Sequence, residues 1–269
     1  MLPNFLIIGA ARCGTTTLYN QLQRHPNIYL PPEKRPEPHF FYKTAEYARG
    51  IGYYENKYFT AWRGQKAVGE ASTSYVFGSR VAQRVCESLP GIKLICLLRN
   101  PIERAFSSYW HTVASGIERL PFAEAIEREQ ERAAALASTA LGELAPFAYV
   151  ERGLYHRQLE RWFDEFDPAQ MLVVTFDELV GDPRGVLADV ARFLGVSPGD
   201  LPNGEIKAEN KSVPIGAYMA PEVRRKLVEA FRDDVYQLGR LIGRDLTHWI
   251  SDTDAGRPLS EHSPVLSHR

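Results

Sequence analysis

Residues 5–17 of the chain read FLIIGAARCGTTT, an apolar run that passes through Gly9 into a turn of small residues and then three threonines. An apolar run of this length predicts a buried β-strand, and a helical pattern continues from about Thr15 to Arg24. Strand, tight loop and helix in this order direct backbone N–H groups and a helix N-terminus at one point, which favours an anion there. The segment therefore predicts a phosphate-binding loop.

This loop differs from the phosphate loop of nucleoside triphosphatases, GxxxxGK[ST], at one informative position. Gly9 and Gly14 have the right spacing, but Thr15 stands where a lysine would contact the β- and γ-phosphates. The cation is instead Arg12, which stays protonated and can bind two phosphate or sulfate oxygens at once. We therefore expect a phosphate that carries a different transferable group. The alternative is a glycine turn that joins a strand to a helix without a ligand.

Strands and helices alternate along the rest of the chain. Further strands are expected at Lys66–Val68, Lys93–Leu98 and Met171–Thr175, with helices at about Ser79–Ser88, from Pro101, at Tyr155–Phe166 and at Pro183–Leu194. The alternation predicts an α/β fold in a single domain, with a mostly parallel central sheet flanked by helices.

The less regular stretches complete the predicted organisation. Pro31–Pro38 holds four prolines and is expected to be an extended loop. Glu118–Leu144 has a helical composition and is expected to form a helix over the site, whereas Val196–Pro221 is rich in loop signals. A last helix follows, with apolar residues from Val223 to Leu241 at core-facing spacing. We expect one domain over residues 1–250 and a polar tail over 251–269.

Composition narrows the class of protein. Among 269 residues, 44% are hydrophobic, and 32 basic residues face 33 acidic ones for a formal net charge of −1. This balance argues against a dedicated nucleic-acid binder. The longest apolar runs have the length of strands, well short of the roughly 20 residues that a membrane span needs. With no leader pattern at the N-terminus, the expectation is a cytoplasmic, bacterial protein without an integral membrane segment.

The cysteines suggest neither a disulfide framework nor a metal site. Cys13, Cys86 and Cys96 are few and scattered, and no CxxC or Cys/His cluster has the spacing of metal ligands. Cys86 and Cys96 lie in apolar, periodic stretches and are expected to be buried as small hydrophobic residues. No metal cofactor is expected.

A second anion site is predicted where the strand Lys93–Leu98 ends. Arg99 follows this strand directly, at the edge of an α/β sheet where ligands usually bind, and Ser107 lies about two helical turns beyond Asn100. An arginine and a hydroxyl in this arrangement could hold one isolated phosphate. The alternative is an arginine at a sheet edge and a helical serine, each with a structural role.

The two motifs together resemble those of sulfotransferases that use 3′-phosphoadenosine 5′-phosphosulfate (PAPS). Residues 9–28, GAARCGTTTLYNQLQRHPNI, resemble the 5′-phosphosulfate loop of the heparan-type carbohydrate sulfotransferases and their bacterial relatives. This resemblance implies that Arg12, Cys13, Gly14, Thr15, Thr16 and Thr17 bind the 5′-phosphosulfate, and that Arg99 and Ser107 bind the 3′-phosphate. The family usually has lysine at the position of Arg12, so a fixed electrostatic clamp replaces a group that is able to release a proton.

Residues 37–41, EPHFF, resemble the acidic base motif of the heparan-type branch. Sulfuryl transfer needs a base that takes the proton of the attacking O–H or N–H group. The resemblance implies Glu37 as the base with His39 in support, and the reverse assignment is the alternative. A proline-rich surface loop anchored by Phe40 and Phe41 is the structural alternative. Lys34 and Arg35 could meet an anionic acceptor or simply be solvated.

Two further segments match the family more loosely. Glu70, in the GEASTSY segment after the second predicted strand, could orient the acceptor or a basic side chain, or make a structural hydrogen bond. Lys211 falls in a loop that often closes over the nucleotide in this family.

The sequence thus predicts an enzyme that transfers a sulfuryl group from PAPS to a hydroxyl or amine, releasing adenosine 3′,5′-bisphosphate. The resemblance favours a carbohydrate or glycoconjugate acceptor, with a polyketide, lipid or other natural product as the alternative. The rival classes are a P-loop kinase or nucleoside triphosphatase and a non-catalytic nucleotide-binding protein. Oligomeric state has no signature in the sequence.

Overall fold

The computed structural model describes residues 1–32, 37–137, 139, 145–201, 213–214 and 216–251. The chain forms two compact units. The sheet unit contains the described residues of 1–98 and 158–210, and the helical unit contains those of 99–157 and 211–269. The predicted boundary between a domain at 1–250 and a tail at 251–269 stays a prediction, because almost all of the tail lies outside the described residues.

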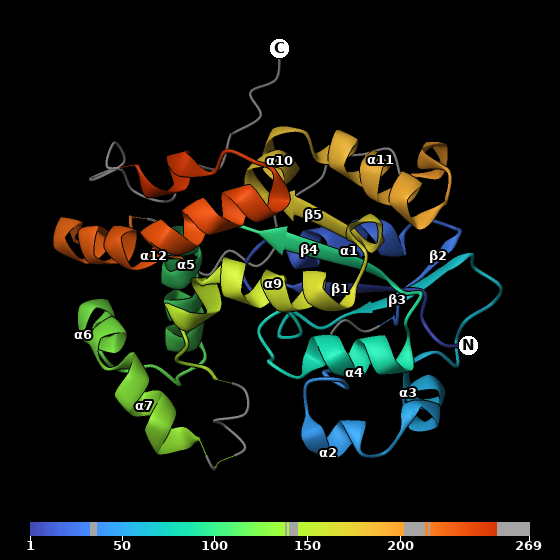
Figure 1. Ribbon diagram of the computed structural model, residues 1–269, viewed down its shortest axis with the longest axis horizontal. Helices are drawn as coiled ribbons and strands as arrows, with labels where there is room; N and C mark the ends of the chain where they lie inside the picture. The colour runs from blue at the N-terminus through green and yellow to red at the C-terminus, as the bar shows by residue number, and fades with distance from the viewer. Residues whose placement is uncertain (33–36, 138, 140–144, 202–212, 215, 252–269) are drawn as a thin grey trace. The chain divides into compact units, whose positions relative to one another are not determined.

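A five-stranded sheet forms the centre of the sheet unit (Figure 1). Its order is β2-β3-β1-β4-β5, and all neighbouring strands are parallel. The strands are β1 (Phe5–Gly9), β2 (Ile28–Tyr29), β3 (Ala67–Ala71), β4 (Lys93–Leu98) and β5 (Met171–Thr175). The predicted α/β class with a parallel sheet flanked by helices is confirmed. The short edge strand β2 was not predicted.

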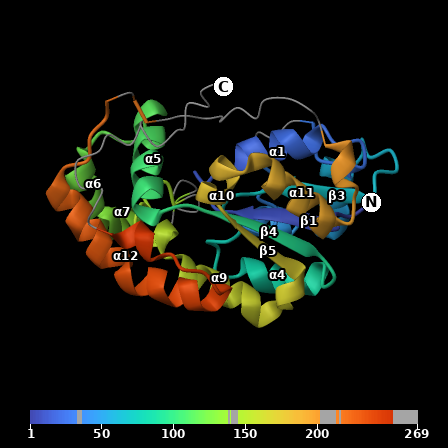
Figure 2. The ribbon, with the colours of Figure 1, turned by 90° about the horizontal axis from the view of Figure 1, so that it is seen from above.

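Helices cover both faces of this sheet (Figure 2). On one face lie α1 (Thr15–Gln23), α10 (Phe176–Gly181) and α11 (Pro183–Leu194). On the other face lie α4 (Val81–Ser88) and the part of α9 (Tyr155–Glu165) that belongs to this unit. Two short helices, α2 (Thr44–Tyr47) and α3 (Ile51–Tyr58), precede β3, and the 3₁₀ turns are η2 (Pro168–Gln170) and η3 (Pro198–Asp200).

The helical unit contains α5 (Pro101–Ala114), α6 (Phe122–Glu127), α7 (Glu129–Leu136) and α12 (Pro221–Ile242), with the 3₁₀ turns η1 (Glu151–Gly153) and η4 (Thr247–Ile250). Part of its core is formed by Ala105, Tyr109, Ala125 and Tyr149. The expected apolar stripe of the last helix is confirmed as far as Leu238, since Val223, Leu227, Phe231, Val235 and Leu238 are buried, whereas Leu241 is only partly buried.

The expected helix over Glu118–Leu144 is wrong in its extent. Helical structure begins only after Pro121 and is interrupted at Arg128, which separates α6 from α7. The buried Glu118 carboxylate explains the late start, because it accepts the N–H groups of Arg119 and Leu120 and thereby forms a local turn. It also pairs with Arg132 at 2.8 Å.

The second predicted strand continues beyond Val68, because Gly69, Glu70 and Ala71 also pair with β1. Gly69 lies opposite Phe5 in the register, and a Cβ atom at Gly69 would come within 2.5 Å of the Phe5 ring. Glycine is a weak strand former, but here its missing side chain makes room for the aromatic ring. Strand β3 runs to Ala71, so Glu70 lies within the strand and not, as the sequence had suggested, after it.

The expectations for the cysteines hold in part. Cys96 on β4 is fully buried, and burial raises the pKa of its thiol. Cys86 on α4 is only partly buried, which corrects the expectation of a core residue. All three cysteines are free thiols.

Gly69→Ala should destabilise the sheet unit, because the new methyl group overlaps the Phe5 ring. We expect a loss of about 1–3 kcal/mol in the free energy of unfolding, measured by urea denaturation. Gly91→Ala is the matched control, since a Cβ atom there meets nothing within 4 Å. Equal stability of the two variants would contradict the packing described here.

Candidate active site

Two glycines, one at each end of the loop between β1 and α1, leave no room for a side chain. A Cβ atom at Gly9 would lie 2.5 Å from Cγ1 of Val76 and 3.1 Å from the carbonyl oxygen of Thr73. Gly14 caps α1 in the left-handed conformation, with φ of 89°, and a Cβ atom there would lie 2.9 Å from Leu179. Both ends of the loop are therefore packed so closely against neighbouring segments that only glycine fits there.

The residues predicted to bind the 5′-phosphosulfate, Arg12 to Thr17, form this loop and the start of α1. Arg12 has φ of 71°, another left-handed position, and α1 begins at Thr15, so the N–H groups of its first turn are directed at the loop. The loop backbone is tied to the sheet by the N–H group of Ala10, which donates to the carbonyl of Leu97 over 2.7 Å. Cys13 is fully buried and contributes backbone rather than an exposed thiol. This arrangement suits a phosphate or sulfate group.

Glu37 is the carboxylate that the sheet unit fixes near this loop. The backbone N–H group of Thr73 donates to Oε2 of Glu37 over 2.8 Å, and the Thr73 hydroxyl contacts Oε2 at 2.9 Å and Oε1 at 3.2 Å. Thr73 is also the residue whose carbonyl lies against Gly9. One residue therefore connects the carboxylate to the backbone of the anion loop.

The side chains of His39 and Glu37 lie close together. Nε2 of His39 lies 3.5 Å from Oε2 of Glu37, and the two side chains are only 16% and 11% exposed. The chain between them is not extended, because His39 has φ of 49°. Since Oε2 receives Thr73 and faces His39, Oε1 is the less crowded oxygen of the carboxylate.

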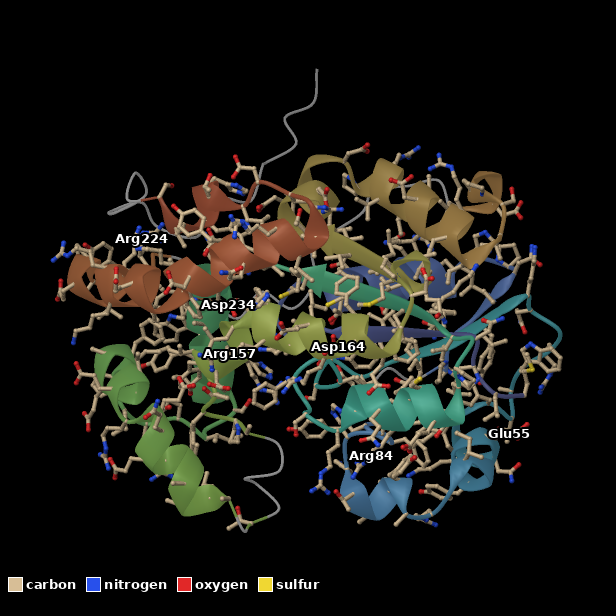
Figure 3. The ribbon with its side chains drawn as sticks, in the orientation of Figure 1. Glu55, Arg84, Arg157, Asp164, Arg224 and Asp234 are labelled. Carbon is tan, nitrogen blue, oxygen red and sulfur yellow. The ribbon has the colours of Figure 1, made fainter. Side chains whose placement is uncertain are left out.

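The segment that carries these two residues is bound on both sides of its backbone. The N–H group of His39 donates to the Ser72 hydroxyl over 2.8 Å. Arg84 on α4 donates to the carbonyls of Phe41 and Tyr42, over 2.8 and 3.4 Å. Figure 3 shows Arg84 on the side of α4 that faces α2. The expected anchoring of this segment by Phe40 and Phe41 is confirmed, since both side chains are fully buried, and these hydrogen bonds hold its backbone as well.

Glu70 carries a buried carboxyl group and lies within β3, whereas the sequence had suggested a position after the strand. Its side chain is fully buried, and it accepts hydrogen bonds from the hydroxyls of Tyr54 and Ser72, over 3.0 and 2.9 Å. Burial raises the pKa of this carboxyl to about 7, and the negative charge of Glu37 adds to the increase. Sequence offered one clue, a single acidic residue within an apolar strand.

The helical unit contains the second predicted motif. Arg99 pairs with Glu103 at 2.8 Å, and both side chains are 16% exposed. Asn100 caps α5, accepting the N–H group of Ile102, and Pro101 occupies the first helical position as predicted. Ser107 is buried on the same helix. Glu103, which fixes the direction of the Arg99 guanidinium, was not predicted.

Lys34, Arg35 and Lys211 lie outside the described residues, so their predicted roles stay predictions. Among the residues that the structure does describe, no group of three or more His, Cys, Asp or Glu side chains is placed to hold a metal ion. No helix in that part of the chain is long and apolar enough to cross a membrane.

A sequence model described as a sulfotransferase domain matches residues 2–212. The chain therefore belongs to the sulfotransferase family. The crystal structure of a sulfotransferase from Alicyclobacillus acidocaldarius is similar over 93% of this chain and 100% of its own, with 36% identity and a TM-score of 0.80.

Two other proteins show how far the similarity extends. Mouse heparan sulfate glucosamine 3-O-sulfotransferase 3B1 is 32% identical over 195 residues, which are 72% of this chain and 46% of that protein. The present chain thus spans about half the length of this relative. Mouse SULT7A1, a sulfotransferase solved in complex with PAP, shares the fold with a TM-score of 0.53 at 14% identity, over 90% of this chain and 87% of its own.

Glu70→Gln should flatten the pH dependence of folding stability. The folded-state pKa of Glu70 is raised from 4.5 to about 7, so its stabilising contribution is complete below the lower value and is lost as pH rises through the upper one. This loss is on the order of 3 kcal/mol at most. Urea unfolding near pH 4.5 and above pH 7 measures this loss of folding stability. Glu87→Gln is the control, because Glu87 is exposed on α4. A slope shared by all three proteins would contradict the raised pKa.

Proposed function

We propose that the chain transfers a sulfuryl group from PAPS to a hydroxyl or amine of an acceptor. The observation that carries this proposal is the Glu37–Thr73 contact, which holds a carboxylate beside a loop built for phosphate or sulfate. An anion loop alone would suit any nucleotide-binding protein. A carboxylate fixed next to it supplies the base that group transfer to an O–H or N–H requires.

The donor would be bound by the two predicted motifs. The loop from Arg12 to Thr17 would hold the 5′-phosphosulfate through its N–H groups and the Arg12 guanidinium, while Arg99 and Ser107 would hold the 3′-phosphate. Membership of the sulfotransferase family supports PAPS as the donor, as does the PAP bound to the mouse relative. Thr15, in place of the phosphate-loop lysine, counts against a kinase or nucleoside triphosphatase.

The reaction is an in-line displacement at sulfur. The acceptor oxygen or nitrogen forms a bond to sulfur while the bond between sulfur and the bridging oxygen of the 5′-phosphate breaks. Oε1 of Glu37 takes the acceptor proton, and Arg12 balances the charge that develops on the departing phosphate. The products are the sulfated acceptor and adenosine 3′,5′-bisphosphate. His39, 3.5 Å from Glu37, would hold the carboxylate in place and remains the alternative base.

The acceptor is proposed to be a carbohydrate or glycoconjugate. Its support is the similarity to a heparan sulfate 3-O-sulfotransferase, which covers 72% of this chain. A polyketide, lipid or other natural product is the second candidate, tested in the same acceptor screen. The predicted cytoplasmic location stays a prediction that fractionation of the source cells would check.

Arg99→Ala should weaken the binding of adenosine 3′,5′-bisphosphate by about 10- to 100-fold, because a charge-assisted pair to phosphate is lost. Titration calorimetry measures this, with ATP and magnesium as the competing ligand. Arg119→Ala, which removes an exposed arginine of the same unit, is the control. Equal affinities in Arg99→Ala and the unchanged protein would refute the 3′-phosphate assignment. A preference for ATP would refute the donor itself.

Glu37→Gln should lower kcat by about 10²- to 10⁴-fold, as expected for loss of a general base, and should leave bisphosphate affinity unchanged. The assay follows transfer from PAPS to the best acceptor of the screen, starting with heparan sulfate. Glu87→Gln is the control. If His39→Ala abolishes turnover while Glu37→Gln does not, the roles of the two residues are reversed. If neither variant changes turnover, the loop does not contain the base.

A further inference from the structure

A buried cluster of hydroxyl groups surrounds Glu70, beneath the segment that carries Glu37 and His39. Its carboxyl faces the hydroxyls of Tyr54 from α3, and of Ser72 and Tyr75 from the segment after β3. Besides Tyr54 and Tyr75, the titratable groups near it among the described residues include Glu37, from residues 37–42 (the base segment), and Tyr19 from α1. The mechanism proposed above uses none of this cluster.

Two of these hydroxyls connect Glu70 to the backbone of the base segment. Ser72 donates its proton to Oε2 of Glu70 over 2.9 Å, while its oxygen accepts the N–H group of His39 over 2.8 Å. The Tyr75 hydroxyl is also hydrogen-bonded to Glu70, and its oxygen accepts the N–H group of Phe41 over a longer 3.4 Å.

The direction of each hydrogen bond follows from the charge on Glu70. A hydroxyl has one proton to donate, and an ionised carboxylate can only accept. With Glu70 ionised, the protons of Ser72 and Tyr75 point at the carboxylate, and their lone pairs are left for the N–H groups of His39 and Phe41. A protonated carboxyl, or a glutamine amide, brings its own donor. A hydroxyl that turns to accept this donor no longer directs its proton at residue 70, and its two lone pairs are shared between that donor and the backbone N–H group, which weakens the hydrogen bond to the backbone.

We propose that Glu70 is a positioning residue, whose carboxylate orients the hydroxyls of Ser72 and Tyr75 so that they fix the backbone of the segment carrying Glu37. The naming of Glu37 as the base rests on the proposed function, whereas the orientation of the segment does not. Glu70 does not touch the reacting atoms, because it is fully buried on β3.

The charge of Glu70 makes positioning and stability change in opposite directions with pH. Its pKa is raised to about 7, so the carboxylate that orients the hydroxyls forms as pH rises through this value. The same ionisation removes the stabilising effect of protonation. A carboxyl with a merely structural role would change stability and the ordering of the segment together. Glu70 instead tightens the segment under conditions that weaken the fold.

Hydrogen exchange measured by mass spectrometry tests this in the intact chain without any substrate. In Glu70→Gln at about pH 8, the amides of His39 and Phe41 should exchange up to about tenfold faster than in the unchanged protein, as expected for a weakened hydrogen bond. In the unchanged protein, protection of the peptide over residues 37–42, corrected for intrinsic rates, should fall as pH drops through 7. In Glu70→Gln this protection should not depend on pH, and Glu87→Gln should behave like the unchanged protein.

Ser72→Ala provides a second variant that keeps the carboxyl and removes one link. It should expose the His39 amide as Glu70→Gln does, while the Ser72 N–H group keeps its bond to the carbonyl of Ile7. If Glu70→Gln fails to fold, Ser72→Ala still tests whether the link from Glu70 through Ser72 protects the His39 amide. Unchanged protection of residues 37–42 in the folded variants, together with the same pH profile, would overturn the proposal.

Kinetics add a readout specific to positioning. With the best acceptor, Glu70→Gln should lower kcat by about tenfold while bisphosphate affinity stays constant, and Glu70→Asp should recover part of the loss because it restores a carboxylate. If the chain transfers no sulfuryl group at all, the proposed function fails. The exchange measurement still decides the role of Glu70, so the two failures are distinguishable.

Discussion

Gly9 and the segment that follows β3 approach so closely that no side chain fits between them, and the rest of the candidate site depends on this contact. The N–H groups of Ser72 and Val76 donate to the carbonyls of Ile7 and Ile8, which fixes the segment against β1. Thr73 then holds the Glu37 carboxylate from the same segment. The anion loop and the candidate base are thus positioned by one piece of backbone rather than by two independent loops.

Several local rules of protein structure are broken around this point. Glu70 places a carboxyl inside a central strand, where an apolar residue would be more stable, but hydroxyls surround it. His39 and Arg12 adopt left-handed backbone angles that favour glycine. Such departures concentrate where a protein needs a fixed geometry more than maximum stability.

Local patterns predicted much of the sheet unit. The anion loop, β5 and α11 were placed correctly because a strand period or a helix start is visible within a few residues. Helix α10 also had a local signal, the capping box formed by Thr175 and Glu178, which the prediction missed. The contact between Glu37 and Thr73 had no such signal, because 36 residues separate the two in sequence and only the fold brings them together. Strand β2 is too short for any periodicity.

That short strand also determines how the sheet ends. β2 is an edge, and an unpaired strand edge is a template for adding a strand from another chain. Only two residues pair here, and Pro31 and Pro32, which lack N–H groups, follow almost at once. The carbonyl of Pro31 is already occupied by Tyr19 and Gln23 of α1. At the β2 edge, a neighbouring molecule therefore has few backbone groups with which to extend the sheet.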